Sequence, residues 1–262
     1  MTDQKAVLVG ISGASSSGKT TLARLLRDIF PSTFILHEDD FYKPESELPT
    51  RDGLLDWDCA EAISIPDMIK ALKHIRTEGT FPPFVDSKED QNSVGKCPVS
   101  DTKIAEMKSR VEAWTQPGQP GHDLLVGGAG IKVCLLDGFL LYSAEMAGVM
   151  DLLDVKLFLL VSRDKATQRR AARDGYVTLE GFWADPPGYV DKIVWPNYAE
   201  AHAWLFEGGN VEGKLRMDLL ADKGILAQSS AGLDVDMETS FEWAVEALMR
   251  ELESIGKKVA TG

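Results

Sequence analysis

The sequence lacks the features typical of secreted proteins, of membrane-spanning proteins and of proteins stabilised by structural metal ions. Only three cysteines occur among its 262 residues, Cys59, Cys97 and Cys134, and they form no CxxC or His-paired spacing. Neither a disulfide framework nor a zinc site is indicated. No uninterrupted apolar stretch approaches the roughly 18 residues of a membrane-spanning helix, and the first residues lack the apolar region of a signal peptide. These absences predict a soluble intracellular protein with reduced thiols and no membrane partner. We expect it in the cytoplasm, and the nucleus stays open as a second compartment.

Basic residues are also scarce. The chain has 28 Lys and Arg against 41 Asp and Glu, which gives a formal net charge of -13. Nucleic acids are bound through clustered Lys and Arg that leave a basic footprint, so this balance argues against a nucleic-acid partner. A small or cationic substrate fits better, while the oligomeric state stays open.

Short apolar runs alternate with helical patterns along the chain. The runs that predict strands cover 7–11, 33–36, 132–136, 155–161 and 225–227. Apolar residues recur at helical spacing over 22–29, 68–75 and 241–255, with Pro66 suited to a first helical turn and Gly79 past its end. The alternation predicts an α/β fold, one domain over 1–262, with a central, mainly parallel sheet and helices on both faces.

Residues 80–130 differ in character from the rest. Proline, glycine and charged clusters predict an inserted, partly flexible segment. Ile104, Met107, Val111 and Trp114 lie at helical spacing within it, which predicts one amphipathic helix that packs onto the domain.

Residues 13–20 read GASSSGKT and fit the GxxxxGK[ST] phosphate-loop pattern between a predicted strand and a predicted helix. Glycines let backbone N–H groups curl around phosphate oxygens, and the helix N-terminus adds partial positive charge. Lys19 is expected to bridge the β- and γ-phosphates as a catalytic residue, and Thr20 to bind Mg²⁺. The predicted ATP-binding residues of this loop are Gly13, Ala14, Ser15, Ser16, Ser17, Gly18, Lys19, Thr20 and Thr21.

A phosphate loop alone does not separate kinases from GTPases, motors and transporters. The sequence has no NKxD guanine signature and no LSGGQ segment, and it is too short for a motor. A P-loop kinase that acts on a small molecule remains, with ATP as the expected donor and GTP still open.

Acidic residues follow two of the predicted strands, where open α/β sheets collect their ligands. Asp39 is the first choice for the catalytic base that orients and deprotonates the acceptor hydroxyl. Asp137 occupies the place of a second catalytic carboxylate close to the metal ion. Asp40 either contacts the substrate or caps the following turn.

These motifs occur in one order and resemble the nicotinamide riboside kinases, within the uridine-kinase-like P-loop kinases. The resemblance rests on the phosphate loop, EDDFYKPE at 38–45, LDWD at 55–58, DGFLL at 137–141, RRAAR at 169–173 and the segment from Gly188 to Pro196. It implies Asp39 as base and metal neighbour, and Trp57 with Asp58 as the nucleoside-holding pair. Asp40, Phe41 and Tyr42 extend the implied acceptor site.

The basic run resembles the family's lid, which we expect over 168–190. Arg169 and Arg173 are implied to face ATP phosphates, and Arg170 the acceptor. A surface helix face is the alternative for these arginines. An extra residue near 174–176 leaves the next nucleoside contact open between Tyr176 and Val177. Family members carry Glu where this chain has Asp137, which weakens the role expected for that residue.

The resemblance implies 5′-phosphorylation of nicotinamide riboside by ATP, which feeds NAD synthesis, with nicotinic acid riboside as a second substrate. An aromatic plane suits a positively charged pyridinium ring, so Trp57 is the natural platform unless it is a core residue. The alternatives are a uridine or cytidine kinase and a nucleotide-binding regulatory protein without transfer activity.

Overall fold

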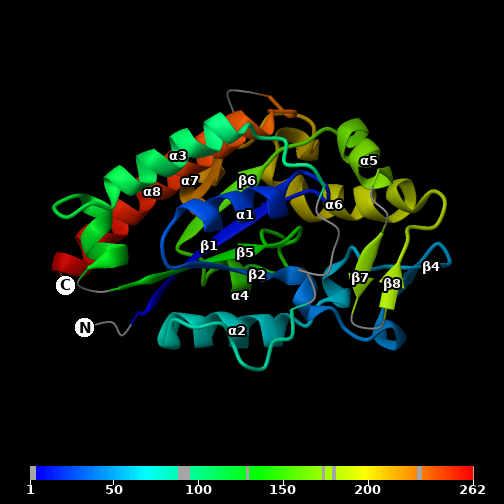
Figure 1. Ribbon diagram of the computed structural model, residues 1–262. Helices are drawn as coiled ribbons and strands as arrows, with labels where there is room; N and C mark the ends of the chain where they lie inside the picture. Colours follow the sequence, from blue (N-terminus) through cyan, green and yellow to red (C-terminus); the bar gives the residue numbers. More distant parts are fainter. Residues whose placement is uncertain are drawn as a thin grey trace.

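The computed structural model describes residues 4–87, 95–127, 130–172, 175–178, 181–228 and 232–261. Its central sheet has the order β2-β5-β1-β6-β9, and every pairing is parallel (Figure 1). The strands are β1 Ala6–Gly13, β2 Thr33–His37, β5 Lys132–Asp137, β6 Val155–Leu159 and β9 Ile225–Ala227. The predicted α/β fold and all five predicted strands are confirmed.

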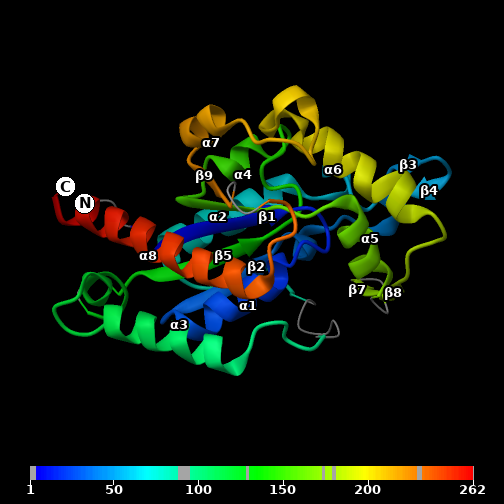
Figure 2. The same cartoon turned by 90° about the horizontal axis from the view of Figure 1, so that it is seen from above.

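Helices cover both faces of the sheet, as predicted (Figures 1 and 2). On one face α1 (Lys19–Ile29) lies beneath α3 (Asp101–Trp114) and α8 (Met237–Thr261), and the three pack around Val7, Val9 and Ile11 of β1. On the other face α2 (Ile65–Glu78) and α4 (Ala147–Met150) pack with Ala6 and Leu8. Alternate residues of β1 therefore belong to two separate cores, which explains its continuous apolar run.

Both ends of α2 follow the sequence signals. Pro66 lies in the first turn, where its missing N–H has no helical partner to lose. Gly79 ends the helix with φ 69° and donates its N–H to the Ile75 carbonyl, a conformation that other residues adopt only under strain.

The amphipathic helix expected within 80–130 is α3, and it packs against α1 and α8 as predicted. The Trp114 ring meets Phe30 edge-on at 6.3 Å, and its indole N–H donates to Glu253 at 2.8 Å. A π-helical turn, His122–Val126, follows. Residues 88–94 and 128–129 lie outside the described residues, so the flexibility of this segment stays a prediction.

The small elements at the carboxyl end of the sheet were not foreseen. Two short hairpins occur there, β3 (Thr50–Arg51) with β4 (Leu54–Leu55) and β7 (Tyr176–Thr178) with β8 (Gly181–Trp183). Within the described ranges the other helices are η1 Glu38–Phe41, η2 Glu45–Glu47, η3 Ala60–Ala62, α5 Arg163–Ala171, η6 Val190–Val194, α6 Trp195–His202, η7 Ala203–Leu205, η8 Glu207–Gly209 and α7 Met217–Lys223. Across the described ranges no helix has the length and apolarity to cross a membrane.

Candidate active site

The phosphate loop joins the end of β1 to the start of α1. Gly13 has φ 146°, and a Cβ there would meet the Leu159 carbonyl oxygen at 2.4 Å, so only glycine fits. Lys19 is buried and its ammonium donates to the Ala14 carbonyl at 3.0 Å. The hydroxyls of Ser16 and Ser17 are buried and have no hydrogen-bond partner within the described structure. The loop is thus shaped to receive an anion, because buried hydroxyls normally have partners.

Thr20 and Asp137 meet at the mouth of this loop. The Thr20 hydroxyl donates to Asp137 Oδ2 at 2.5 Å, and His37 Nδ1 lies 3.4 Å from the same oxygen. Burial opposes the ionisation of Asp137, but its contacts with His37 and Thr20 and the charge of Lys19 outweigh burial, so its pKa is lowered. The pair offers hard oxygen ligands of the kind that Mg²⁺ prefers.

Glu38 is a buried acid to which the sequence analysis assigned no role. Its side chain is fully buried, and Oε2 accepts hydrogen bonds from the backbone N–H of Phe139 at 2.5 Å and Leu140 at 3.2 Å. Burial, and then the charge of Asp39, raise the pKa of Glu38 to about 8. The residue joins the ends of β2 and β5, which places Asp39 and Asp137 on adjoining segments.

The three residues after Glu38 have different surroundings. Asp39 is exposed, as a base that must meet an incoming hydroxyl requires. Asp40 accepts a hydrogen bond from the His37 N–H at 3.3 Å and so caps η1, which supports the capping alternative. Phe41 is buried in the core beside Leu36 and Ile63, so packing accounts for it without a ligand.

Arg170 connects the two halves of the site. It is 8% exposed, and one of its nitrogens donates to the Ser15 hydroxyl of the phosphate loop at 2.8 Å and to Asp58 at 3.1 Å. Its Nε donates to Asp185 at 2.6 Å. Arg169 donates to the carbonyls of Ser16 and Ser17 at 3.2 and 3.3 Å. The alternative of a solvated helix face is therefore wrong for Arg170.

Aromatic rings surround Trp57 on the acceptor side. Trp57 is 7% exposed; its ring lies 5.2 Å from Tyr42 and 5.6 Å from Trp183. Its backbone N–H donates to the Tyr189 hydroxyl at 3.0 Å. Asp58 beside it is buried, and burial raises its pKa although the charge of Arg170 acts in the opposite direction. Aromatic faces next to carboxylates attract a cation with a planar apolar body.

Trp183 is a second residue that sequence reasoning missed. It lies on β8, and its indole N–H donates to Asp185 at 3.1 Å. An aromatic residue two positions before an acid, inside the predicted lid, was the available signal. Of the residues predicted in that region, Arg173 lies outside the described residues, and only the backbone of Tyr176 is described, in β7. The roles expected for both stay predictions.

The described residues contain no group of three or more His, Cys, Asp or Glu side chains placed to hold a metal ion. This does not conflict with a nucleotide-bound Mg²⁺, which keeps most of its waters and takes one or two protein ligands. The Thr20 and Asp137 oxygens fit that requirement.

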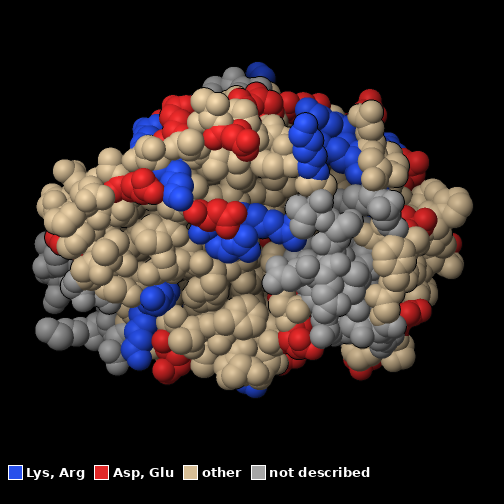
Figure 3. Space-filling view, viewed as in Figure 1, with Lys and Arg blue, Asp and Glu red and all other residues tan. Residues whose placement is uncertain are grey.

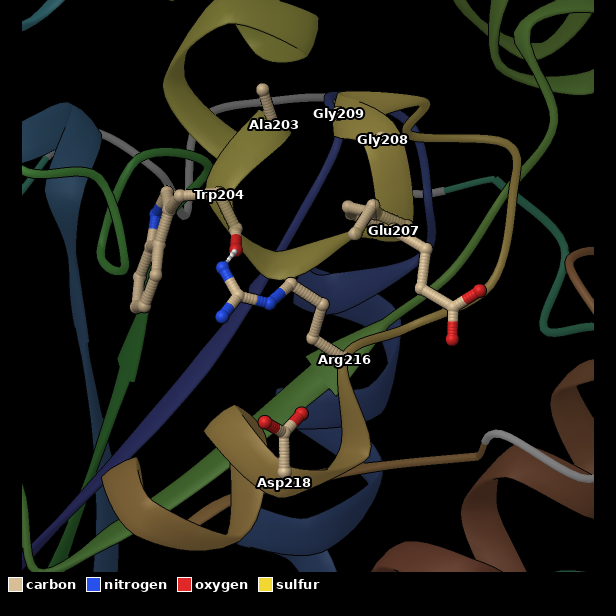
Figure 4. Close-up of a pocket in the computed structure, with 8 residues that line it drawn as sticks. Ala203, Trp204, Glu207, Gly208, Gly209, Arg216 and Asp218 are labelled. Carbon is tan, nitrogen blue, oxygen red and sulfur yellow. Dashed lines mark hydrogen bonds between the residues drawn. The ribbon is translucent and has the colours of Figure 1, made fainter.

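One surface feature adjoins this site, and a second lies apart from it. Figure 3 shows basic side chains gathered beside α5, whose sequence includes Arg163, Lys165 and Arg169, on an otherwise mixed surface. Figure 4 shows a pocket in which Arg216 donates to the Trp204 carbonyl and which Glu207 and Asp218 also line. Its volume is about 640 Å³. None of the predicted site residues lines this pocket.

A phosphate loop that the buried Arg170 joins to the carboxylate of Asp58, beside Trp57, places this chain among the P-loop kinases that phosphorylate small molecules. No family model matches the chain. It is 35% identical over 250 residues to the nicotinamide riboside kinase of Schizosaccharomyces pombe, an alignment that covers 95% of this chain and 99% of that protein. The chain belongs to the nicotinamide riboside kinase family.

Two further relatives carry the same family name. The nicotinamide riboside kinase of Saccharomyces cerevisiae is 32% identical and aligns with 82% of this chain and 85% of its own length. Nicotinamide riboside kinase 2 of Mus musculus is 28% identical and aligns with 78% of this chain and 83% of its own length. A solved sugar kinase from Janibacter sp. HTCC2649 covers 93% of this chain and 94% of its own at 15% identity, with a TM-score of 0.40.

Proposed function

We propose that this chain transfers the γ-phosphate of ATP to the 5′-hydroxyl of nicotinamide riboside, with nicotinic acid riboside as a second substrate. The observation that carries the proposal is Arg170, which contacts the phosphate loop at Ser15 and the carboxylate of Asp58 beside Trp57. One side chain thus spans the donor and acceptor halves. The named relatives support the riboside as the acceptor.

Each group of site residues has a separate role in the proposed phosphoryl transfer. Lys19 and the loop amides hold the β- and γ-phosphates, and Arg169, with Arg173, would add charge from the lid. Exposed Asp39 accepts the proton of the 5′-hydroxyl as the bond to phosphorus forms. Mg²⁺, when bound, would be held by Thr20 and Asp39, with Asp137 close to it through the Thr20 hydroxyl, and would neutralise phosphate charge. Asp58 grips the ribose hydroxyls, and the Trp57 and Trp183 rings hold the pyridinium ring.

A lid that closes over the site, expected at 168–190, would exclude water from the transferring phosphate. We place the enzyme in the cytoplasm, with the nucleus as a second compartment.

The test is an ADP-release assay with Mg²⁺ and ATP across nicotinamide riboside, nicotinic acid riboside, uridine and cytidine. We expect the two pyridine ribosides to turn over with a higher kcat/KM than either pyrimidine nucleoside. Faster turnover of uridine would establish the pyrimidine alternative. No turnover of any nucleoside, with ATP binding intact, would establish the regulatory alternative.

A further inference from the structure

A buried carboxylate and a buried amide form hydrogen bonds next to Trp57 and Asp58, which we call the acceptor pair. Asp56 is 4% exposed and Asn197, on α6, is 7% exposed. The amide nitrogen of Asn197 donates to the two oxygens of Asp56 at 2.8 and 2.9 Å. Asp56 Oδ1 also accepts the backbone N–H of Asp58 at 3.1 Å. A buried charge is costly unless it is hydrogen-bonded, so this pair is held in one geometry.

Arg51 fixes the orientation of the Asn197 amide. Its guanidinium donates to the amide oxygen, so the amide nitrogen must face Asp56. Arg51 reaches this position because the β3–β4 hairpin turns at Asp52 and Gly53, whose φ angles are 51° and 75°. Two consecutive positive φ values give the tight turn that matches the twist of a hairpin.

The backbone between the hairpin and the acceptor pair is also fixed. The N–H of Asp56 donates to the Pro49 carbonyl at 2.9 Å, and the N–H of Trp57 to the Tyr189 hydroxyl at 3.0 Å. Together with the Asp58 N–H, three successive donors are satisfied by partners of fixed position. The directions of the Trp57 and Asp58 side chains follow from these contacts.

We propose that Asn197 is a positioning residue for the acceptor nucleoside. Through Asp56 it holds the backbone N–H of Asp58, next to Trp57, and among the described residues it forms no hydrogen bond with the donor half of the site. The inference rests on the proposed function only in assigning the nucleoside to Trp57 and Asp58.

Exchange of the two polar groups gives a sharp test. N197D places two carboxylates face to face, and we expect the nucleoside KM to rise at least tenfold while the ATP KM changes less than twofold. D56N/N197D restores one amide and one carboxylate, with Arg51 now facing a carboxylate, and should return the nucleoside KM to within about threefold of wild type. N210D makes the same chemical change at an exposed site and should alter neither constant.

Three results would overturn the proposal. These are an unchanged nucleoside KM in N197D, an equal rise of both KM values, or a double variant no better than N197D. If N197D does not fold, the nucleoside KM and the ATP KM are measured in N197A instead. This variant removes the amide without adding a charge.

The substrate panel on the wild-type enzyme tests the proposed function separately. The KM values of the variants are read on whichever nucleoside the wild type phosphorylates best. A pyrimidine preference would therefore defeat the riboside assignment and leave the test of Asn197 intact.

Discussion

At the residue scale, the position of a charged group decides whether it can act or only hold. Asp39 is exposed at the end of β2, whereas its neighbour Glu38 is fully buried and bound to backbone N–H groups. Proton transfer needs a carboxylate that a substrate can reach. Asp39 is therefore the acid of this pair that can serve as the proposed base, whereas Glu38, whose pKa burial raises to about 8, holds the ends of β2 and β5 together.

Asp39→Ala is expected to lower kcat by about 100- to 10,000-fold, the usual contribution of a positioned base. The phosphate loop stays intact, so the Kd for ATP should change little. Steady-state turnover and calorimetric titration with an ATP analogue measure the two effects. Asp28→Ala, at an exposed carboxylate of α1, is the control. Near-normal kcat in Asp39→Ala would remove Asp39 from the base role.

His202 gives a prediction about pH. The residue is buried on α6, stacks on Phe158 at 5.6 Å, and its Nε2 has no partner within the described structure. Burial lowers its pKa to about 4, below the roughly 6.5 of an unfolded chain. The unfolded state therefore takes up the proton first, and stability falls as the pH drops from about 6.5 toward 4.

The expected loss from this group between pH 7 and pH 5 is about 2 kcal/mol. Urea unfolding of wild type and His202→Phe at both pH values measures it, because Phe keeps the stacking without a titrating group. The wild type should lose about 2 kcal/mol more than the variant. Equal losses in the two proteins would mean that His202 is protonated in the folded state.

At the element scale, the short hairpin of β7 and β8 directs neighbouring side chains to opposite faces of the strand. Successive residues of a strand point to opposite faces. Trp183 turns toward Trp57, while Phe182 is 64% exposed. The sequence pattern cannot reveal this arrangement, because strands of two or three residues carry no measurable period.

Trp183→Ala should raise the nucleoside KM about 5- to 30-fold, since removal of an aromatic face from a cation costs about 1–2 kcal/mol. The ATP KM should stay within twofold. Phe182→Ala, one residue away on the outer face, should leave both constants unchanged. Equal effects of the two substitutions would assign Trp183 to hairpin stability instead of the acceptor site.

At the scale of the whole molecule, the donor half rests on the core strand β1 and the acceptor half on peripheral elements. Strand β1 is buried along its whole length between two helix layers. The acceptor half is assembled from loops, the hairpins and α6. Donor binding should therefore persist when the acceptor half is altered.

The increase in the free energy of unfolding on binding an ATP analogue tests whether donor binding persists in the variants. An ATP analogue at 100 times its Kd should raise the free energy of unfolding by about 2.7 kcal/mol, both in wild type and in Asp39→Ala. At the same concentration Lys19→Ala should gain less than about 1 kcal/mol, because its affinity is lost. Urea denaturation with and without analogue measures the gain. Full stabilisation of Lys19→Ala would show that Lys19 does not bind the phosphates.

The sequence by itself determined the donor half and the sheet. Gly13 to Thr20 is one local motif whose backbone path follows from its glycines, and the strands and long helices have apolar periods that local sterics and burial impose. The packing of Phe41 in the core and the hydrogen bond from the His37 N–H to Asp40 are contacts that no motif shows. Only the tertiary structure joined Asp56 to Asn197, 141 residues apart, and Arg170 to Asp58, 112 apart. Pairing over such distances depends on how the whole chain packs, and no local pattern encodes it.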